Sequence, residues 1–218
     1  MIDTEHPNSM PPRPHDSYSR RPEARRSKEG VKSALSTIAI LLIAPLIAVF
    51  LTVFVFQSYQ VDGVSMETTL SHNDRLIVWK LPKTWSRITS HQYVPKRGDV
   101  VVFVEPSLGR FGQDPSKQLI KRVLGLPGER NVVKNGSLTV YNNEHPEGFQ
   151  PDKTLPYGNV IKTTTMDNEW VVGKDQLFVA GDNRSNSLDS RTFGPINTNN
   201  IVGKLVLRLL PLSDLKKF

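Results

Sequence analysis

Residues 118–129 read Gln-Leu-Ile-Lys-Arg-Val-Leu-Gly-Leu-Pro-Gly-Glu, a short apolar run that ends in a turn. Proline fixes φ and glycine permits unusual backbone angles, so Gly125–Glu129 closes the strand that Gln118–Leu124 predicts. Similar short runs, rich in β-branched and apolar side chains, recur at 75–80, 99–104, 137–141, 176–180 and 201–209. Turn residues lie near the ends of most of them, a pattern typical of antiparallel domains. The sequence therefore predicts a mostly β fold.

An apolar segment of membrane length precedes these strands. Residues 33–61 contain no charged side chain, and Ala34–Phe56 is 23 residues long and almost wholly apolar. As a helix it would extend about 34 Å, enough to cross a bilayer core of about 30 Å. We therefore expect a single transmembrane helix at 33–56. A cleaved secretory signal fits less well, because the segment is too long for its apolar region and no small-x-small site follows closely.

Basic residues flank only one side of this segment. Six Lys or Arg residues lie between positions 20 and 32, and none occurs between Gln57 and Asp74. The positive-inside rule then places the N-terminus in the cytoplasm and residues 57–218 outside the cell membrane. Residues 1–32 are rich in Pro, Arg and Ser, and this composition predicts a disordered basic cytoplasmic tail.

The composition argues against several kinds of site. The net charge is +7, but the basic residues form no block or helix-spaced stripe, which favours contact with anionic lipid over nucleic acid. There is no cysteine, and the five histidines lack ligand spacing, so we expect no metal and no cofactor. Trp79 and Trp85, beside Lys80 and Lys83, fit either a surface that dips into lipid headgroups or an ordinary strand with one core face.

Two residues have the chemistry of a nucleophile and its base. Ser65 follows Gly63, where the backbone can turn tightly or approach a ligand. A serine hydroxyl attacks only when a base removes its proton, and no histidine lies in a setting typical of a Ser-His-Asp triad. Lys121 lies in an apolar run, where burial would lower its pKa from about 10.4 towards neutrality. The alternative is a solvent-facing Lys121 with Arg122 turned inward or paired.

Four segments follow the apolar helix in a fixed order: Ser65-Met66, Arg97–Phe103, Lys121–Glu129 and Gly181–Arg191. Together they resemble the type I signal peptidases, membrane-anchored Ser/Lys endopeptidases that remove signal peptides from exported proteins. The resemblance implies that Ser65 is the nucleophile, that Lys121 is the general base and that an acyl-enzyme forms. It also implies a β-rich catalytic domain at 57–130 and 175–218, interrupted by a smaller subdomain at 131–174.

The resemblance assigns supporting roles to five further residues. The hydroxyl of Ser187 would hydrogen-bond to the lysine and orient it. Asp189 and Arg191 would form an ion pair that holds the site loop, and Asp182 would support the site without taking part in the chemistry. Met66 would line the substrate cleft.

Three positions depart from the family pattern. Thr68 replaces the proline of Ser-Met-x-Pro-Thr-Leu, so the turn after the nucleophile is less rigid, and Glu129 replaces an aspartate. Gly63 occupies a position where some members carry a hydroxyl as second oxyanion donor, the first being the Ser65 backbone N–H. Losing such a donor lowers the rate by roughly 10²–10³, so a backbone N–H or water must replace it or the enzyme is slower.

These features imply a membrane-bound serine endopeptidase that cleaves N-terminal signal peptides from exported preproteins. Its expected partners are those preproteins, membrane lipid and the protein-export machinery. One alternative is a dedicated Ser/Lys peptidase that processes a narrow set of surface or secretion proteins. Another is a catalytically silent, membrane-anchored scaffold.

Overall fold

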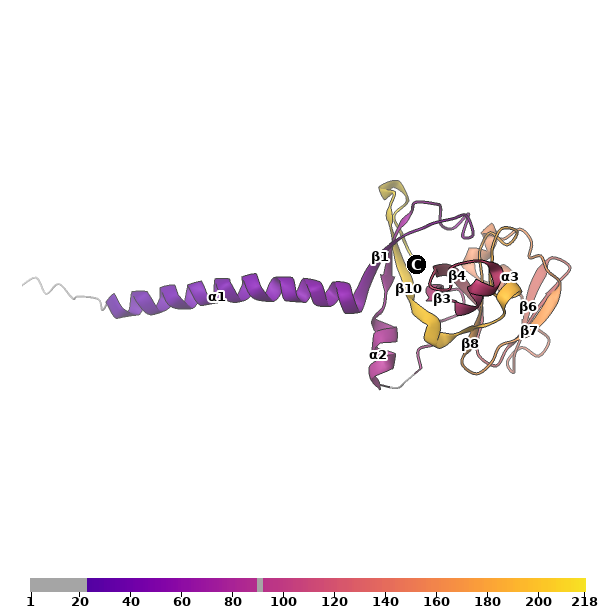
Figure 1. Ribbon diagram of the computed structural model, residues 1–218, viewed down its shortest axis with the longest axis horizontal. Coiled ribbons are helices and arrows are strands. Elements are labelled where there is room, and N and C mark those ends of the chain that lie inside the picture. Colours follow the sequence, from indigo (N-terminus) through magenta and orange to yellow (C-terminus); the bar gives the residue numbers. More distant parts are fainter. Residues whose placement is uncertain (1–22, 90–91) are drawn as a thin grey trace, which may run out of the picture. The chain divides into compact units, whose positions relative to one another are not determined.

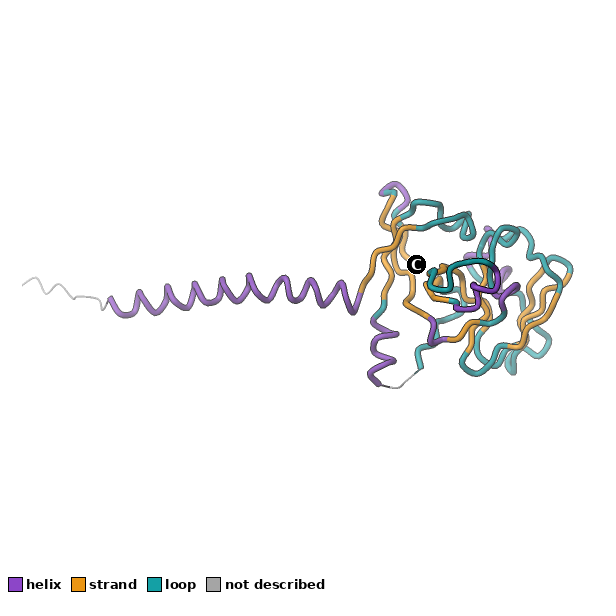
Figure 2. Tube along the Cα trace, in the orientation of Figure 1, coloured by secondary structure: helices purple, strands orange, loops and turns teal. Residues whose placement is uncertain are grey.

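The computed structural model describes residues 23–89 and 92–218, and its chain divides into two compact units, 1–47 and 48–218. Residues 1–22 of the expected tail lie outside the described residues. Figure 2 shows that strands and loops make up most of the second unit. The predicted mostly β, antiparallel fold is confirmed.

The apolar segment is helical. Helix α1 (Glu23–Phe50) continues into a π-helical turn, η1 (Leu51–Val55). Within them, Lys32–Val55 is the one described stretch that is long and apolar enough to cross a membrane. The helix begins ten residues before the expected boundary at 33, in a stretch of Glu, Ala, Arg and Lys residues that favour helix.

The main sheet has eight antiparallel strands, in the order β1-β2-β10-β3-β4-β8-β9 with β11 beside β10 (Figure 1). In chain order the strands are β1 (Phe56–Gln60), β2 (Arg75–Trp79), β3 (Val100–Val104), β4 (Gln118–Gly125), β8 (Gln176–Ala180), β9 (Ile196–Asn197), β10 (Ile201–Leu210) and β11 (Lys216–Lys217). Five of them coincide with predicted runs to within one residue at each end.

A second sheet lies in the part of the chain assigned to the inserted subdomain, 131–174, and begins one residue before it. It has three strands in the order β6-β5-β7, namely β5 (Arg130–Lys134), β6 (Ser137–Tyr141) and β7 (Asn168–Val171). Two short helices, α3 (Pro151–Thr154) and η3 (Pro156–Val160), occupy the connection between β6 and β7. The boundaries 131 and 174 stay a prediction.

Short helices complete the fold. Helix α2 (Leu81–Thr89) follows β2, η2 (Pro106–Phe111) follows β3, and α4 (Ser190–Phe193) follows the loop after β8. Two 3-10 turns, η4 (Thr198–Asn200) and η5 (Leu212–Asp214), flank β10. Trp85 on α2 is exposed, whereas Trp79 is a half-buried residue of β2.

The central strands are covered on both faces. Successive side chains of a strand point to opposite sides, and β3 buries Val100 in one apolar cluster and Val101 in another. In β4, Val123 and Leu124 likewise belong to different clusters. Adjacent residues of β4 can therefore both be buried while meeting different surroundings, and this arrangement positions the candidate site.

Candidate active site

Ser65 lies in the turn-rich segment that joins β1 to β2. The Val61 N–H donates to the Asp74 carbonyl and the Asn73 N–H donates to the Val61 carbonyl, both at 2.9 Å, so the hairpin continues past its strands. Gly63 then takes a φ of 108°, a conformation that glycine adopts without strain. The Ser65 carbonyl accepts the Asn183 N–H at 3.1 Å, which ties the segment around Ser65 to the loop after β8.

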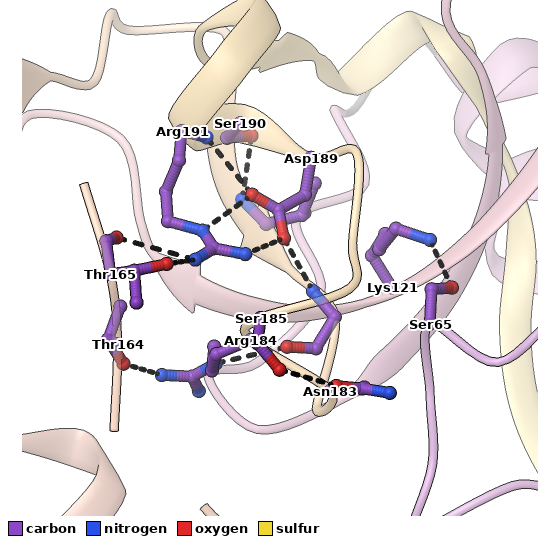
Figure 3. Close-up of polar contacts among 12 residues, drawn as sticks. Ser65, Lys121, Thr164, Thr165, Asn183, Arg184, Ser185, Asp189, Ser190 and Arg191 are labelled. Atoms are coloured by element: carbon purple, nitrogen blue, oxygen red, sulfur yellow. Dashed lines mark hydrogen bonds and ion pairs between the residues drawn. The ribbon is translucent and has the colours of Figure 1, made fainter. Parts of the chain in front are cut away.

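Lys121 extends from β4 to this serine. Its Nζ lies 2.7 Å from Ser65 Oγ (Figure 3). The same nitrogen lies 3.0 Å from the Ile120 carbonyl oxygen. Lys121 is 3% exposed, so the solvent-facing alternative is wrong. Burial lowers the pKa of Lys121 to about 8, although the nearby carboxylates of Asp189 and Asp182 act in the opposite direction. The two side chains are therefore within direct hydrogen-bonding distance of each other.

Ser65 and Lys121 line a cavity of about 330 Å³. Its wall is formed by Gln60–Val64 on one side and Gln118–Ile120 on another. Apolar side chains make up much of the remaining lining: Tyr59, Leu76, Val102, Leu108 and Leu188. The cavity therefore offers two stretches of backbone and a surface of mixed apolar and polar side chains next to the Ser/Lys contact.

Asp182 pairs with Arg122, the neighbour of the candidate base. The Arg122 Nε and Nη2 groups donate to the two carboxylate oxygens at 2.8 and 2.6 Å, and Thr69 Oγ1 donates to the same carboxylate at 2.5 Å. Arg122 also donates to the Gly98 carbonyl at 2.7 Å and stacks 4.3 Å from the Tyr157 ring. Both members of the pair are buried. Asp182 is thus fully engaged in holding β4, consistent with a supporting role.

Asp189 and Arg191 form a bidentate ion pair inside the site loop (Figure 3). The Arg191 Nε and Nη2 groups donate to the Asp189 carboxylate at 2.9 and 2.8 Å. The same carboxylate accepts the Gly181 N–H at 3.0 Å, which closes the loop on the end of β8. Charge-assisted bidentate contacts of this kind fix geometry as well as contribute energy.

Arg184 is a loop residue that the sequence did not identify. Its Nε donates to the Gly181 carbonyl at 3.0 Å, and its Nη2 donates to Asp152 of α3 at 2.8 Å. A second contact joins Nη1 to the same carboxylate, and Nη1 also donates to Thr164. Asp152 and Thr164 come from the connection between β6 and β7, so Arg184 ties that connection to the site loop. No local signal links positions 152 and 184.

Two supporting residues lie differently from expectation. Ser187 Oγ is buried and has no hydrogen-bond partner within residues 23–89 and 92–218, so its expected bond to Lys121 is not formed. The hydroxyl instead lies against Gly181, where a Cβ atom would collide with both Ser187 Oγ and the Ser65 carbonyl oxygen. Met66 is 1% exposed and packs in the core with Leu70 instead of lining the cavity, because its unbranched side chain fills the space beneath the turn.

Two backbone N–H groups near Ser65 differ in their availability as oxyanion donors. The Ser65 N–H makes no hydrogen bond to any described residue and is available to a substrate. The Gly63 N–H donates to His72 Nδ1 at 3.2 Å, so it is not a free replacement for the missing hydroxyl donor. Glu129 closes its own turn by accepting the Leu126 N–H at 2.7 Å. Among the described residues no cluster of His, Asp and Glu could hold a metal.

The known proteins that this chain resembles are all signal peptidases I in the three comparisons that follow. The chain is 34% identical over 177 residues to the probable signal peptidase I-1 of Synechocystis sp., covering 81% of this chain and 82% of that protein. It is 32% identical over 193 residues to signal peptidase I P of Bacillus subtilis subsp. natto, covering 88% of this chain and 97% of that protein. A crystal structure of a signal peptidase I from Enterococcus faecalis V583 has a TM-score of 0.39 at 23% identity, covering 52% of this chain and 98% of that one.

The family model described as signal peptidase, peptidase S26, matches residues 34–210. This match includes Ser65, β4 and the loop after β8. The chain belongs to the signal peptidase family, peptidase S26, and is a serine peptidase.

Proposed function

We propose that this protein is a membrane-anchored endopeptidase that cleaves signal peptides from exported preproteins, with Ser65 as nucleophile and Lys121 as general base. One observation carries the proposal: Lys121 Nζ lies 2.7 Å from Ser65 Oγ while its side chain is almost completely buried. Burial keeps part of the lysine population neutral at physiological pH, and the short distance allows direct proton transfer.

The reaction proceeds in two stages. Neutral Lys121 takes the Ser65 proton, and the alkoxide attacks the scissile carbonyl carbon to form a tetrahedral oxyanion, which the Ser65 N–H stabilises. The lysine then gives its proton to the leaving amine, and an acyl-enzyme remains on Ser65. Water, deprotonated by the same lysine, attacks the ester and releases the signal peptide.

An exposed strand edge supports substrate binding by backbone pairing. β4 pairs with β3 along 118–122, but β8 joins its other side only from Arg122 onward. Residues 118–121 therefore have no strand neighbour on that side within the described structure. An extended peptide placed there would run between this edge and residues 61–64, with both stretches of backbone within the same cavity. Family members prefer small side chains at the first and third positions before the cut.

The helix Lys32–Val55 is proposed as the membrane anchor, with the N-terminus in the cytoplasm and the catalytic domain outside the cell membrane. An apolar helix whose side chains remain exposed needs an apolar medium around it, and lipid provides one. Exposed Trp85 on α2 fits a place among the headgroups. Secreted preproteins, membrane lipid and the export machinery follow as partners.

The test is cleavage of purified preproteins in liposomes by the wild-type chain and by Ser65→Ala. We expect cleavage at a small-x-small site by the wild type and none by Ser65→Ala, while Ser58→Ala, an exposed serine of β1, remains active. Cleavage of one preprotein among several unrelated ones would point to a dedicated peptidase. Cleavage of none by folded wild type would favour the scaffold alternative, and undiminished activity of Ser65→Ala would remove Ser65 as nucleophile.

A further inference from the structure

His72 lies outside the four segments that carry the family resemblance, and it hydrogen-bonds to the backbone that leads to Ser65. The Gly63 N–H donates to His72 Nδ1 at 3.2 Å. An imidazole nitrogen accepts a hydrogen bond only when it carries no proton, so this contact requires a neutral ring with its proton on Nε2. The bond restrains Gly63 at its positive φ of 108°.

This contact extends the hairpin towards the nucleophile. Val61 exchanges backbone hydrogen bonds with Asp74 and Asn73, and the Gly63–His72 bond is the next contact across the hairpin before Ser65. Gly63 and its neighbours also form the cavity wall opposite β4. His72 therefore acts on the site through Gly63, without touching the reacting atoms.

Protonation offers His72 a different partner. Asp62 Oδ1 lies 3.7 Å from His72 Nδ1, and the other oxygen of Asp62 lies 3.9 Å from Lys117 Nζ. Among the described residues, Asp62 is the charged group in ion-pair range of His72, and Lys117 contacts that same carboxylate. An imidazolium carries a proton on both nitrogens, so it donates to the carboxylate and can no longer accept from Gly63.

We propose that His72 is a positioning residue for peptide cleavage. The neutral ring accepts a hydrogen bond from Gly63 and so holds this residue near Ser65. When the ring is protonated, Nδ1 donates to the Asp62 carboxylate instead, Gly63 is released and the cleavage rate falls. The inference rests on the proposed role of Ser65. Histidine side chains change charge between pH 5 and 8, within the range in which the enzyme is assayed. Loss of one hydrogen bond corresponds to an effect of about fivefold.

The test compares the wild type with His72→Asn from pH 8 to pH 5. The Asn Oδ1 occupies nearly the place of imidazole Nδ1 and accepts from Gly63 at every pH. We expect the wild-type to variant ratio of kcat/KM to be close to one at pH 8 and to fall about fivefold by pH 5. Titration of Lys121 affects both proteins alike and cancels in the ratio.

His145→Asn is the matched control. His145 has a similar exposure, 48% of its side chain against 52% for His72, and its Nδ1 also lies near a carboxylate, that of Glu147. His145 belongs to the connection after β6. The wild-type to variant ratio of kcat/KM for His145→Asn is expected to stay constant with pH. A constant or rising ratio for His72→Asn would overturn the proposal.

Asp62→Asn keeps the inference testable if His72→Asn unfolds, as judged by thermal melting. Removing the carboxylate charge weakens the contact that competes with Gly63 once the ring is protonated, so the His72-dependent loss of rate between pH 8 and pH 5 should become smaller. An unchanged pH dependence would contradict the exchange of partners. Full activity of Ser65→Ala at pH 8 would instead refute the proposed function, whatever the ratios show.

Discussion

Burial of Lys121 predicts the acid limb of the pH–rate profile. In the proposed mechanism the neutral lysine is the base, so activity should be lost as pH falls through the lysine's pKa of about 8. At pH 7 roughly one lysine in ten is neutral, and at pH 6 roughly one in a hundred. We therefore expect kcat/KM to fall about tenfold per pH unit below pH 8 and to level off above it.

The magnitude follows from the surroundings of the side chain. With its ordinary pKa of 10.5, about one lysine in 3,000 would be neutral at pH 7. Burial lowers the pKa to about 8 and so raises the neutral fraction about 300-fold. Asp189 and Asp182 oppose this effect, but each carboxylate is already paired with an arginine.

The assay is cleavage of a preprotein in detergent or liposomes between pH 5.5 and 9.5, with folding followed by circular dichroism at each pH. Lys121→Arg should be inactive throughout, because a guanidinium does not lose its proton in this range. Lys134→Arg, at an exposed position of β5, is the matched control and should keep the wild-type profile. A profile that stays flat down to pH 5.5, or an active Lys121→Arg, would refute the reasoning.

Two further predictions concern stability and are measured by thermal or urea unfolding. Gly181→Ala should destabilise the fold by about 1–3 kcal/mol and slow cleavage, because the added methyl collides with the Ser65 carbonyl; unchanged stability and rate would contradict this contact. Asp152→Asn should destabilise by about 3–5 kcal/mol by leaving the buried Arg184 without its charged partner, whereas Lys153→Gln, at the exposed neighbouring position, should have little effect.

Every strand that the sequence predicted has buried side chains on at least one face. Val100–Val104 is mostly buried, so its apolar, β-branched composition is a sufficient signal. β1 was missed because Phe56–Gln60 continues directly from the apolar helix and then alternates with polar residues. β7, Asn168–Val171, is largely exposed and carries little apolar pattern. Segments of this kind become strands because they pair with a neighbouring strand in the folded protein.

Side-chain partners were predicted less well than the residues themselves. Asp189 and Arg191 are two positions apart, and their ion pair is local. Two other contacts, Arg184 with Asp152 and Gly63 with His72, form only because the chain folds back on itself. The sequence around these residues gives no signal that predicts either contact. Ser187 and Met66 lie in the expected segments but point elsewhere. A resemblance transfers positions along the chain more reliably than it transfers side-chain contacts.

The alternation of side chains along β4 explains why a lysine, and not the adjacent arginine, faces Ser65. Lys121 and Arg122 are both buried, yet they point to opposite faces of the strand. Arg122 cannot lose its proton, so its charge must be compensated, and Asp182 with the Gly98 carbonyl does this. Lys121 has no ion pair among the described residues, so burial is free to lower its pKa. A shift of one residue in register would place a permanent cation beside Ser65 and remove the base.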